Sequence, residues 1–313
     1  MDIDIDVRAA LERLAAGAPA EPPPVGDWRS RRAAIDAVYA GLEAGSDRVD
    51  GVETADFAAP SADGHQIPLR LYRVAGRLPT ALVVHLHGGG MIAGSIDGYD
   101  QVCRRYAVDA GVAVLAVAYR LAPEFPFPTP VEDCVAAVEW AVRHVAEVHL
   151  PGERVVLMGD SAGGGLAAAT ALACRDRGVG PLHAQVLIYP MLDDRTSAAD
   201  PAVEPFLTWT AADNVTGWQA LLGDGYGHDE PSALASAARA RSLRDLPRTY
   251  VEVGQLDLFR DESIAYAKRL MDDEVSVHLV VRPGVVHGYD RFAPDSRAAR
   301  AAHADRVEFL RSL

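Results

Sequence analysis

From residue 81 onward, short apolar runs alternate with longer segments of helical periodicity. The apolar runs cover residues 81–86, 112–119, 155–158, 184–189, 249–253 and 275–281. The helical segments cover residues 99–110, 130–145, 164–177, 261–271 and 296–310. Strands that alternate with helices in this way are typical of a mostly parallel sheet. The pattern therefore predicts an α/β fold in which helices cover both faces of the sheet.

The first eighty residues follow a different pattern. Residues 7–44 have helical periodicity, which the prolines at 22–24 interrupt. Because proline cannot continue a helix, we expect two helical pieces joined by a stiff bend. Alternating stretches at 52–57 and 67–74 flank the turn-forming residues 61–64. These stretches predict a pair of antiparallel strands.

Residues 200–235 interrupt the alternation of strands and helices. They contain Trp209, Trp218 and Tyr226 but no clear strand. We interpret this stretch as an insertion over the top of the sheet. The chain has 313 residues, which fits one α/β domain with an appended cap better than two independent domains.

Composition and charge exclude several classes of partner. The content of hydrophobic residues (49%) and charged residues (24%) is ordinary for a globular protein. A formal net charge of −14 argues against nucleic acid and against anionic membrane surfaces. No apolar run approaches the length of a membrane span, and the first residues are acidic where a signal peptide is basic. We expect a cytoplasmic protein.

The three cysteines are Cys103, Cys134 and Cys174. Their number is odd, and their spacing matches no metal site. All three lie in segments with helical periodicity. We expect buried free thiols in a reducing compartment.

The pentad Gly159-Asp160-Ser161-Ala162-Gly163 lies between an apolar run and a small-residue run that predicts a helix. A Gly-x-Ser-x-Gly sequence between a strand and a helix is the pattern of a nucleophile elbow. The sharp turn pushes the serine hydroxyl out of the sheet, and the glycines leave room for the neighbouring backbone. Ser161 is therefore the candidate nucleophile.

A serine nucleophile needs a base to accept its proton and an acid to orient that base. His287 follows a late strand, and Pro283, Gly284 and Gly288 around it indicate a loop. Asp257 comes just after the run at 249–253, where open α/β sheets build their sites. Asp261 is the alternative acid, but its place at the start of a helix is explained by favourable interaction with the helix dipole. We choose His287 as the base and Asp257 as the acid.

The transition state of acyl transfer also needs donors for an oxyanion. The triplet Gly88-Gly89-Gly90 follows the apolar run at 81–86, and glycines let backbone N–H groups point into a cavity. Ala162 follows the nucleophile at a helix N-terminus, so its N–H completes the oxyanion hole. The chain order Ser161, Asp257, His287 is that of the α/β-hydrolase fold.

With these residues, the chain resembles the hormone-sensitive-lipase family of α/β-hydrolases, the bacterial esterase group. The resemblance runs from about residue 80 to residue 287. It rests on residues 87–90 (His-Gly-Gly-Gly), 119–124 (Tyr-Arg-Leu-Ala-Pro-Glu), 159–164 (Gly-Asp-Ser-Ala-Gly-Gly), 257–262, and the pair His287-Gly288. It implies that Gly89, Gly90 and Ala162 donate to the oxyanion. Met91 stands where the family often has an aromatic residue, and Leu258-Phe259 replaces the family's usual Pro-Leu.

The resemblance also implies hydrolysis of carboxylic esters, with a cap built from N-terminal helices. We divide the chain into an N-terminal helical cap segment, residues 1–50, and an α/β-hydrolase catalytic domain, residues 51–313, with residues 200–235 as a cap insertion. The expected substrates are short- to medium-chain esters in an apolar pocket, for which Met91 and Trp209 are candidate lining residues. For residues 119–124 we predict a structural turn with a buried Arg–Glu network.

Three alternatives remain open. The same triad can cleave aryl amides, so the chain could be an amidase or deacetylase. A non-catalytic small-molecule receptor could keep the pocket, although such receptors typically lose the histidine. His85 and His87 could share a metal from one face of a strand, but no third ligand is visible. We expect no metal and no cofactor. The expected partner is a small-molecule ester substrate, and a homodimer with a second copy of the chain stays open.

Overall fold

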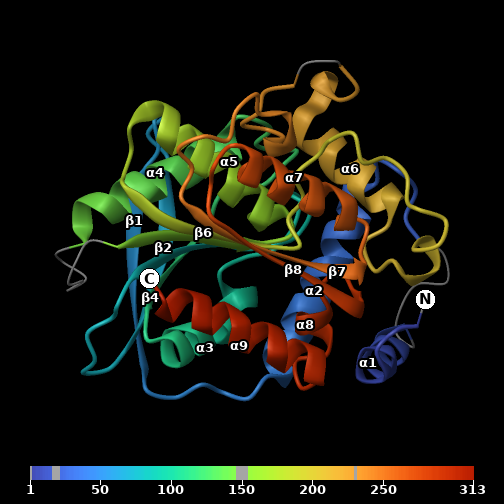
Figure 1. Cartoon of the computed structure of the whole chain (residues 1–313), viewed down its shortest axis with the longest axis horizontal. Coiled ribbons are helices and arrows are strands. Elements are labelled where there is room, and N and C mark those ends of the chain that lie inside the picture. The colour runs from blue at the N-terminus through green and yellow to red at the C-terminus, as the bar shows by residue number, and fades with distance from the viewer. Residues whose placement is uncertain (1, 16–21, 146–153, 229–230) are drawn as a thin grey trace.

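Eight strands form one sheet in the order β1-β2-β4-β3-β5-β6-β7-β8. The computed structural model describes residues 2–15, 22–145, 154–228 and 231–313 (Figure 1). The strands are β1 (Val52–Pro60), β2 (Gln66–Val74), β3 (Leu82–Leu86), β4 (Ala113–Val117), β5 (Val155–Asp160), β6 (Leu182–Ile188), β7 (Arg248–Leu256) and β8 (Val277–Val286). β2 pairs antiparallel with β1 and β4, and all other pairs are parallel. The predicted fold class is confirmed.

Helices cover both faces of this sheet, as the sequence predicts. They are α1 (Ile5–Ala15), α2 (Trp28–Gly45), α3 (Asp100–Ala110), α4 (Thr129–His144), α5 (Ala162–Arg177), α6 (Ala211–Leu222), α7 (Arg260–Asp272), α8 (Tyr289–Phe292) and α9 (Arg297–Arg311). Short 3₁₀ turns lie at η1 (Asp97–Tyr99), η2 (Glu204–Phe206), η3 (Gly223–Gly225) and η4 (Ala237–Arg239). α4, α5 and α7 lie on one face, and α3 and α9 on the other (Figure 1).

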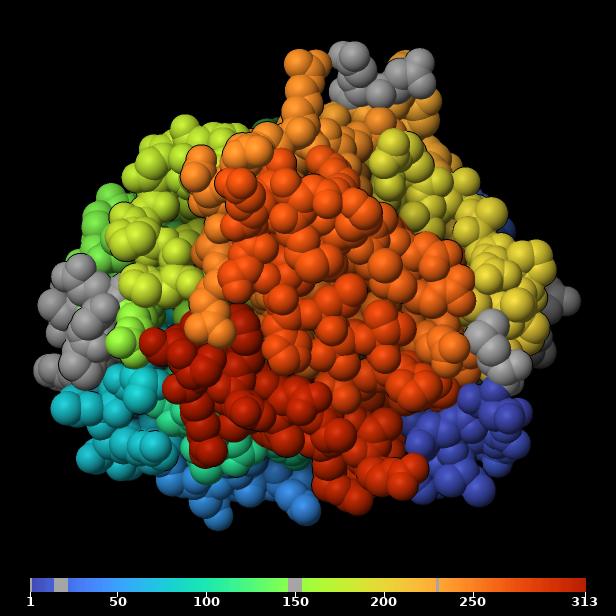
Figure 2. Space-filling view, viewed as in Figure 1, coloured from blue at the N-terminus to red at the C-terminus, as the bar shows by residue number. Residues whose placement is uncertain are grey.

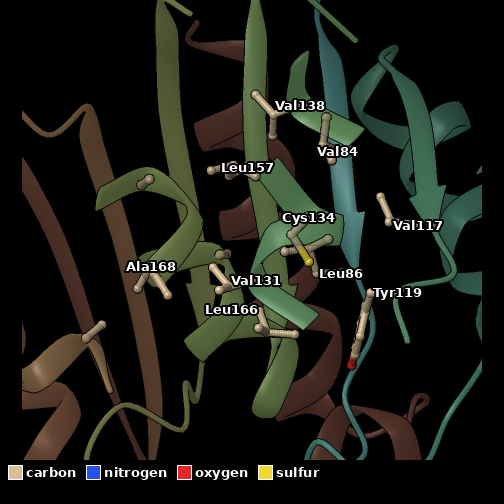
Figure 3. Packing of buried hydrophobic residues seen from close by; sticks show 14 of the residues in the cluster. Val84, Leu86, Val117, Tyr119, Val131, Cys134, Val138, Leu157, Leu166 and Ala168 are labelled. Carbon is tan, nitrogen blue, oxygen red and sulfur yellow. The ribbon is translucent and has the colours of Figure 1, made fainter. Parts of the chain in front are cut away.

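The central strands are apolar on both sides because both sides are covered. In β3, Val84 and Leu86 belong to the core beneath α4 and α5, whereas Val83 belongs to the core beneath α3 and α9. Side chains of α4 and α5, among them Cys134 and Leu166, pack directly against β3 and β5 (Figure 3). This core holds the carboxyl ends of β3 and β5 side by side.

The two N-terminal helices occupy different places. α2 contacts α6, and Arg31 of α2 forms an ion pair with Asp213 of α6 at 2.7 Å. α1 instead contacts α8, and its residue Val7 is buried in the core beneath α3 and α9. Residues 200–228 contain no strand, and α6 begins with a capping box at Thr210. The division into a cap and a catalytic domain stays a prediction.

β8 is longer than the sequence pattern predicts. Residues 283–286, which we expected in a loop, belong to the strand. The pairing of β8 with β7 shifts between Gly254–Arg282 and Leu256–Val286, so β8 carries extra residues at a bulge. Gly284 has φ +71° there, a conformation that favours glycine. The bulge lets proline and glycine stay in the strand, and His287 follows it directly.

The face of the molecule seen in Figure 2 is formed largely by C-terminal residues, coloured orange and red. Cys103, Cys134 and Cys174 are buried and free. Within the described ranges, every helix is too short or too polar to cross a membrane.

Candidate active site

Ser161 lies in a sharp turn between β5 and α5. Its backbone has φ 55° and ψ −121°, which a non-glycine residue adopts only under strain. A Cβ on Gly159 would lie 2.2 Å from the Gly163 carbonyl oxygen, and one on Gly163 would lie 2.0 Å from the Leu86 carbonyl oxygen. The two glycines are therefore required by the close approach of the backbone on either side of the serine.

The structure brings Ser161, His287 and Asp257 together. His287 Nε2 lies 2.8 Å from Ser161 Oγ, and His287 Nδ1 lies 2.9 Å from Asp257 Oδ2. A carboxylate only accepts, so Nδ1–H donates to Asp257, and Nε2 is left to accept the serine hydroxyl proton. Asp257 also accepts from the backbone N–H of Phe259 at 2.9 Å. Asp261, the alternative acid, instead forms an ion pair with Arg260 at the surface, at 2.7 Å.

Three side chains that the sequence analysis missed hold the histidine in place. The rings of Tyr189 and Phe259 meet the His287 imidazole edge to face, with centroids 4.8 and 5.1 Å away. Thr208, just before Trp209, donates its hydroxyl to the His287 carbonyl oxygen at 2.7 Å. Phe259 lies in the segment 257–262 beside Asp257, whereas no local motif marks Tyr189 or Thr208, because they come from parts of the chain far from His287.

The glycine triplet forms a tight loop beside Ser161. Gly89 and Gly90 have φ 133° and 61°, and a Cβ on Gly89 would lie 2.1 Å from the Ala93 carbonyl oxygen. Within the part of the chain that the structure describes, the N–H groups of Gly89 and Gly90 have no hydrogen-bond partner. The N–H of Gly88 differs, because it donates to the Tyr99 hydroxyl at 3.1 Å. Gly88 therefore lies in the loop but has its donor engaged.

Both candidate pocket residues lie beside this loop. Met91 follows the triplet with φ 67° and is buried. The Trp209 ring covers Gly90, since a Cβ on Gly90 would lie 2.2 Å from Trp209 Cη2. Trp209 is oriented by Asn214, whose Oδ1 accepts from the indole Nε1 at 3.2 Å. Residues 200–228 thus place an apolar ring against the loop that carries the expected oxyanion donors.

His85 lies in β3 and His87 directly follows that strand, and both side chains are buried. Burial lowers the pKa of His85 to about 3 and that of His87 to about 4, so both are neutral at pH 7. The His87 ring stacks on Tyr119 with centroids 4.4 Å apart. In the described ranges, no three His, Cys, Asp or Glu side chains are grouped as a metal site requires. Packing accounts for this histidine pair.

The predicted Arg–Glu network at residues 119–124 is wrong in its partners. Arg120 binds the buried carboxylate of Asp133 through Nη2 at 2.7 Å and Nε at 2.9 Å. Glu124 instead binds Arg32 of α2 at 2.7 Å. The two charged side chains of the turn leave it in different directions, one toward α4 and one toward α2. The turn is therefore structural, but it joins two elements that lie far apart in the sequence.

Comparison with known proteins agrees with this geometry. A family model described as alpha/beta hydrolase fold matches residues 83–291. The chain is 38% identical to esterase LipI of Mycobacterium tuberculosis over 224 residues, covering 71% of this chain and 69% of that protein. It is 34% identical to an ethyl acetate hydrolase of Pseudomonas putida over 252 residues, covering 76% of each. Bovine hormone-sensitive lipase (Bos taurus) shares 37% identity over 141 residues, 45% of this chain and 18% of that protein. The solved structure of a bacterial heroin esterase superposes with a TM-score of 0.88 at 33% identity, covering 99% of this chain and 97% of that one.

Proposed function

The chain belongs to the hormone-sensitive-lipase family of α/β-hydrolases and is a carboxylic ester hydrolase, and we propose that Ser161, His287 and Asp257 are its catalytic triad. The observation that supports the assignment is the pair of hydrogen-bond distances, 2.8 Å from Ser161 Oγ to His287 Nε2 and 2.9 Å from His287 Nδ1 to Asp257 Oδ2. The reaction is a two-step acyl transfer through an acyl-enzyme.

In the first step, Ser161 Oγ attacks the ester carbonyl carbon while His287 Nε2 takes the hydroxyl proton. Asp257 keeps the imidazole in the required tautomer and stabilises the imidazolium that forms. The N–H groups of Gly89, Gly90 and Ala162 stabilise the negative carbonyl oxygen. His287 then gives the proton to the alcohol, which leaves. In the second step His287 activates water in the same way, and the acid is released.

We propose short- to medium-chain esters as substrates. Met91 and Trp209 place apolar surface beside the glycine loop, and the ring of Trp209 limits the space above Gly90. The similarity to an ethyl acetate hydrolase supports a small ester. α2 and residues 200–228, joined by Arg31 and Asp213, are the proposed cap over this site. The buried free cysteines support a reducing compartment such as the cytoplasm. The homodimer stays a prediction.

The assignment is tested with Ser161→Ala and a matched pair of aspartate variants. Ser161→Ala is expected to abolish turnover of p-nitrophenyl butyrate and labelling by a serine-reactive phosphonate, while the protein stays folded. Asp257→Asn should lower kcat by about 10⁴, as the wrong tautomer does in serine hydrolases. Asp261→Asn should keep wild-type kcat, because Asp261 interacts with Arg260 outside the site.

Substrate class is tested on the wild-type enzyme. We expect p-nitrophenyl acetate, butyrate or octanoate to give a higher kcat/KM than palmitate, and an ester to exceed its matched amide. A maximum at palmitate would contradict the proposed substrate range. Faster cleavage of the amide would favour an amidase, and turnover by Ser161→Ala would refute the triad.

A further inference from the structure

One buried hydroxyl joins the nucleophile turn to the glycine loop. Tyr99, the last residue of η1, is 1% exposed. Its hydroxyl donates to Asp160 Oδ2 at 2.6 Å and accepts from the backbone N–H of Gly88 at 3.1 Å. Asp160 directly precedes Ser161, and Gly88 begins the triplet that carries Gly89 and Gly90. Tyr99 Oη therefore links the two segments on which the oxyanion hole is built.

The Gly88 backbone has no room to move toward this pair. A Cβ on Gly88 would lie 2.6 Å from Asp160 Oδ2 and 2.9 Å from Tyr99 Oη. The Gly88 Cα thus lies too close to the two oxygen atoms for any side chain to fit between them. The position of the Gly88 amide, and of the two peptides that follow it, depends on where these oxygens lie.

The Tyr99 ring is itself held from several sides. The Arg291 guanidinium carbon lies 3.9 Å from the Tyr99 ring centroid, and Arg291 Nη2 donates to the Gly98 carbonyl oxygen at 2.8 Å. The ring of Tyr39, from α2, meets Tyr99 edge to face at 5.5 Å. Arg291 lies four residues after His287, so the segment carrying the histidine also contacts Tyr99. Such contacts leave the ring little freedom to rotate or shift.

Asp160 is a strong acceptor in a buried place. Burial raises the pKa of Asp160 to about 6, so its carboxyl group is ionised at pH 7.5. The side chains with the largest effect on this pKa are Arg291, Tyr99, Asp290 and His287. A charged acceptor shortens and strengthens the hydrogen bond from Tyr99 Oη. That bond aligns the hydroxyl so that an oxygen lone pair faces the Gly88 N–H.

We propose that Tyr99 and Asp160 are positioning residues that hold the glycine loop against the nucleophile turn, so that the N–H groups of Gly89 and Gly90 face the developing oxyanion. The inference rests on the proposed function, because it concerns the same oxyanion hole. Neither side chain touches the substrate. Both act through the Gly88 peptide.

The test uses Tyr99→Phe, which removes the hydroxyl and keeps the ring that contacts Arg291. A displacement on the order of 1 Å can cost about a hundredfold in rate, so we expect kcat to fall by between about tenfold and a hundredfold. KM should stay within about twofold, because formation and hydrolysis of the acyl-enzyme both pass through an oxyanion and slow together. Affinity for a trifluoromethyl ketone, which forms an oxyanion on Ser161, should fall by the same factor as kcat/KM.

Tyr106→Phe is the matched control. Tyr106 is buried on α3, and its hydroxyl accepts from Arg306 Nη1 at 3.2 Å. Among the described residues, no hydrogen bond or ring contact joins Tyr106 to the glycine loop. This variant should keep wild-type kcat and wild-type affinity for the ketone. Asp160→Asn keeps an oxygen that can accept from Tyr99, whereas Asp160→Ala removes it. We therefore expect Asp160→Asn to keep most of the kcat that Asp160→Ala loses.

The outcomes separate this inference from the proposed function. If Ser161→Ala abolishes turnover but folded Tyr99→Phe keeps wild-type kcat and ketone affinity, the positioning role is refuted and the triad stands. If Tyr99→Phe changes KM alone, or if Asp160→Asn and Asp160→Ala lose equal activity, the role assigned to the hydrogen bond is also refuted. If Ser161→Ala keeps turnover, the proposed function itself fails.

Discussion

Replacing Arg306 by methionine should strongly destabilise the fold, because it removes the main counter-charge of a buried carboxylate. Glu252, on β7, is 0% exposed. Arg306 Nη2 donates to Glu252 Oε1 at 2.6 Å, and Arg282 Nη2 donates to Oε2 at 3.2 Å. The hydroxyls of Tyr250 and Tyr289 donate to the same carboxylate, each at 2.7 Å. The charges and hydrogen bonds of Arg306 and Arg282 outweigh burial and lower the pKa of Glu252 to about 2.

The size of the effect follows from the loss of one partner of a buried ion pair. Such a loss typically costs about 3–5 kcal/mol, and we expect the lower half of that range because Arg282 remains. A chain of 313 residues unfolds with an entropy of about 0.66 kcal/mol per kelvin. The full range of about 3–5 kcal/mol therefore corresponds to a fall in Tm of about 5–8 °C. Circular dichroism during heating at pH 7 measures the fall in Tm, and urea unfolding at pH 7 measures the loss of unfolding free energy.

Two further measurements identify the buried charge as the cause. Adding Glu252→Gln to Arg306→Met removes the unpaired charge at Glu252, while Asp290, whose Oδ2 Arg306 Nη1 also contacts at 2.6 Å, still lacks that partner. The double variant should therefore regain about 1–2 kcal/mol over the single one. In Arg306→Met the pKa of Glu252 rises in the folded state, so acidification from pH 7 to 5 protonates it and narrows the gap to wild type. A fall in Tm below about 1 °C would refute this reasoning. So would a double variant that is less stable than Arg306→Met.

Two other substitutions probe the glycine loop and a second buried carboxyl group. Gly90→Ala should lower kcat about a hundredfold or more, because its Cβ would meet the Trp209 ring and the backbone φ is +61°. Gly41 lies in a helix with open space around its Cα, so Gly41→Ala should keep wild-type kcat in the same ester assay. Equal kcat for the two alanine variants would contradict this role for Gly90. Burial raises the pKa of Glu262, which accepts from Thr196, from 4.5 to about 8. The folded state thus favours the protonated form, and wild type should lose about 4 kcal/mol relative to Glu262→Gln as the pH rises from 5 to 9 in urea unfolding. If the unfolding free energies of wild type and Glu262→Gln changed with pH in parallel, ionisation of Glu262 would not be what destabilises the wild type.

Much of the fold could be predicted because its signals are local. The apolar runs matched the strands to within a few residues, since strands buried on both faces must be apolar throughout. The need for glycine at positions 159 and 163 could be predicted, because a Cβ at either position would lie within 2.2 Å of a backbone carbonyl oxygen. The end of β8 could not be predicted from the sequence, because pairing with β7 through a bulge keeps Pro283 and Gly284 in the strand.

The sequence by itself determined the order of strands and helices along the chain, the sharp turn at Ser161 and the residues that stand at the carboxyl ends of β3, β5, β7 and β8. Only the tertiary structure decided which side chains meet across elements. Tyr99 lies against Asp160, Arg120 binds Asp133 rather than Glu124, and Trp209 covers Gly90. The physical reason is range. Backbone conformation and hydrophobic periodicity depend on neighbours along the chain, whereas the partner of a buried hydroxyl or charge depends on which elements pack together.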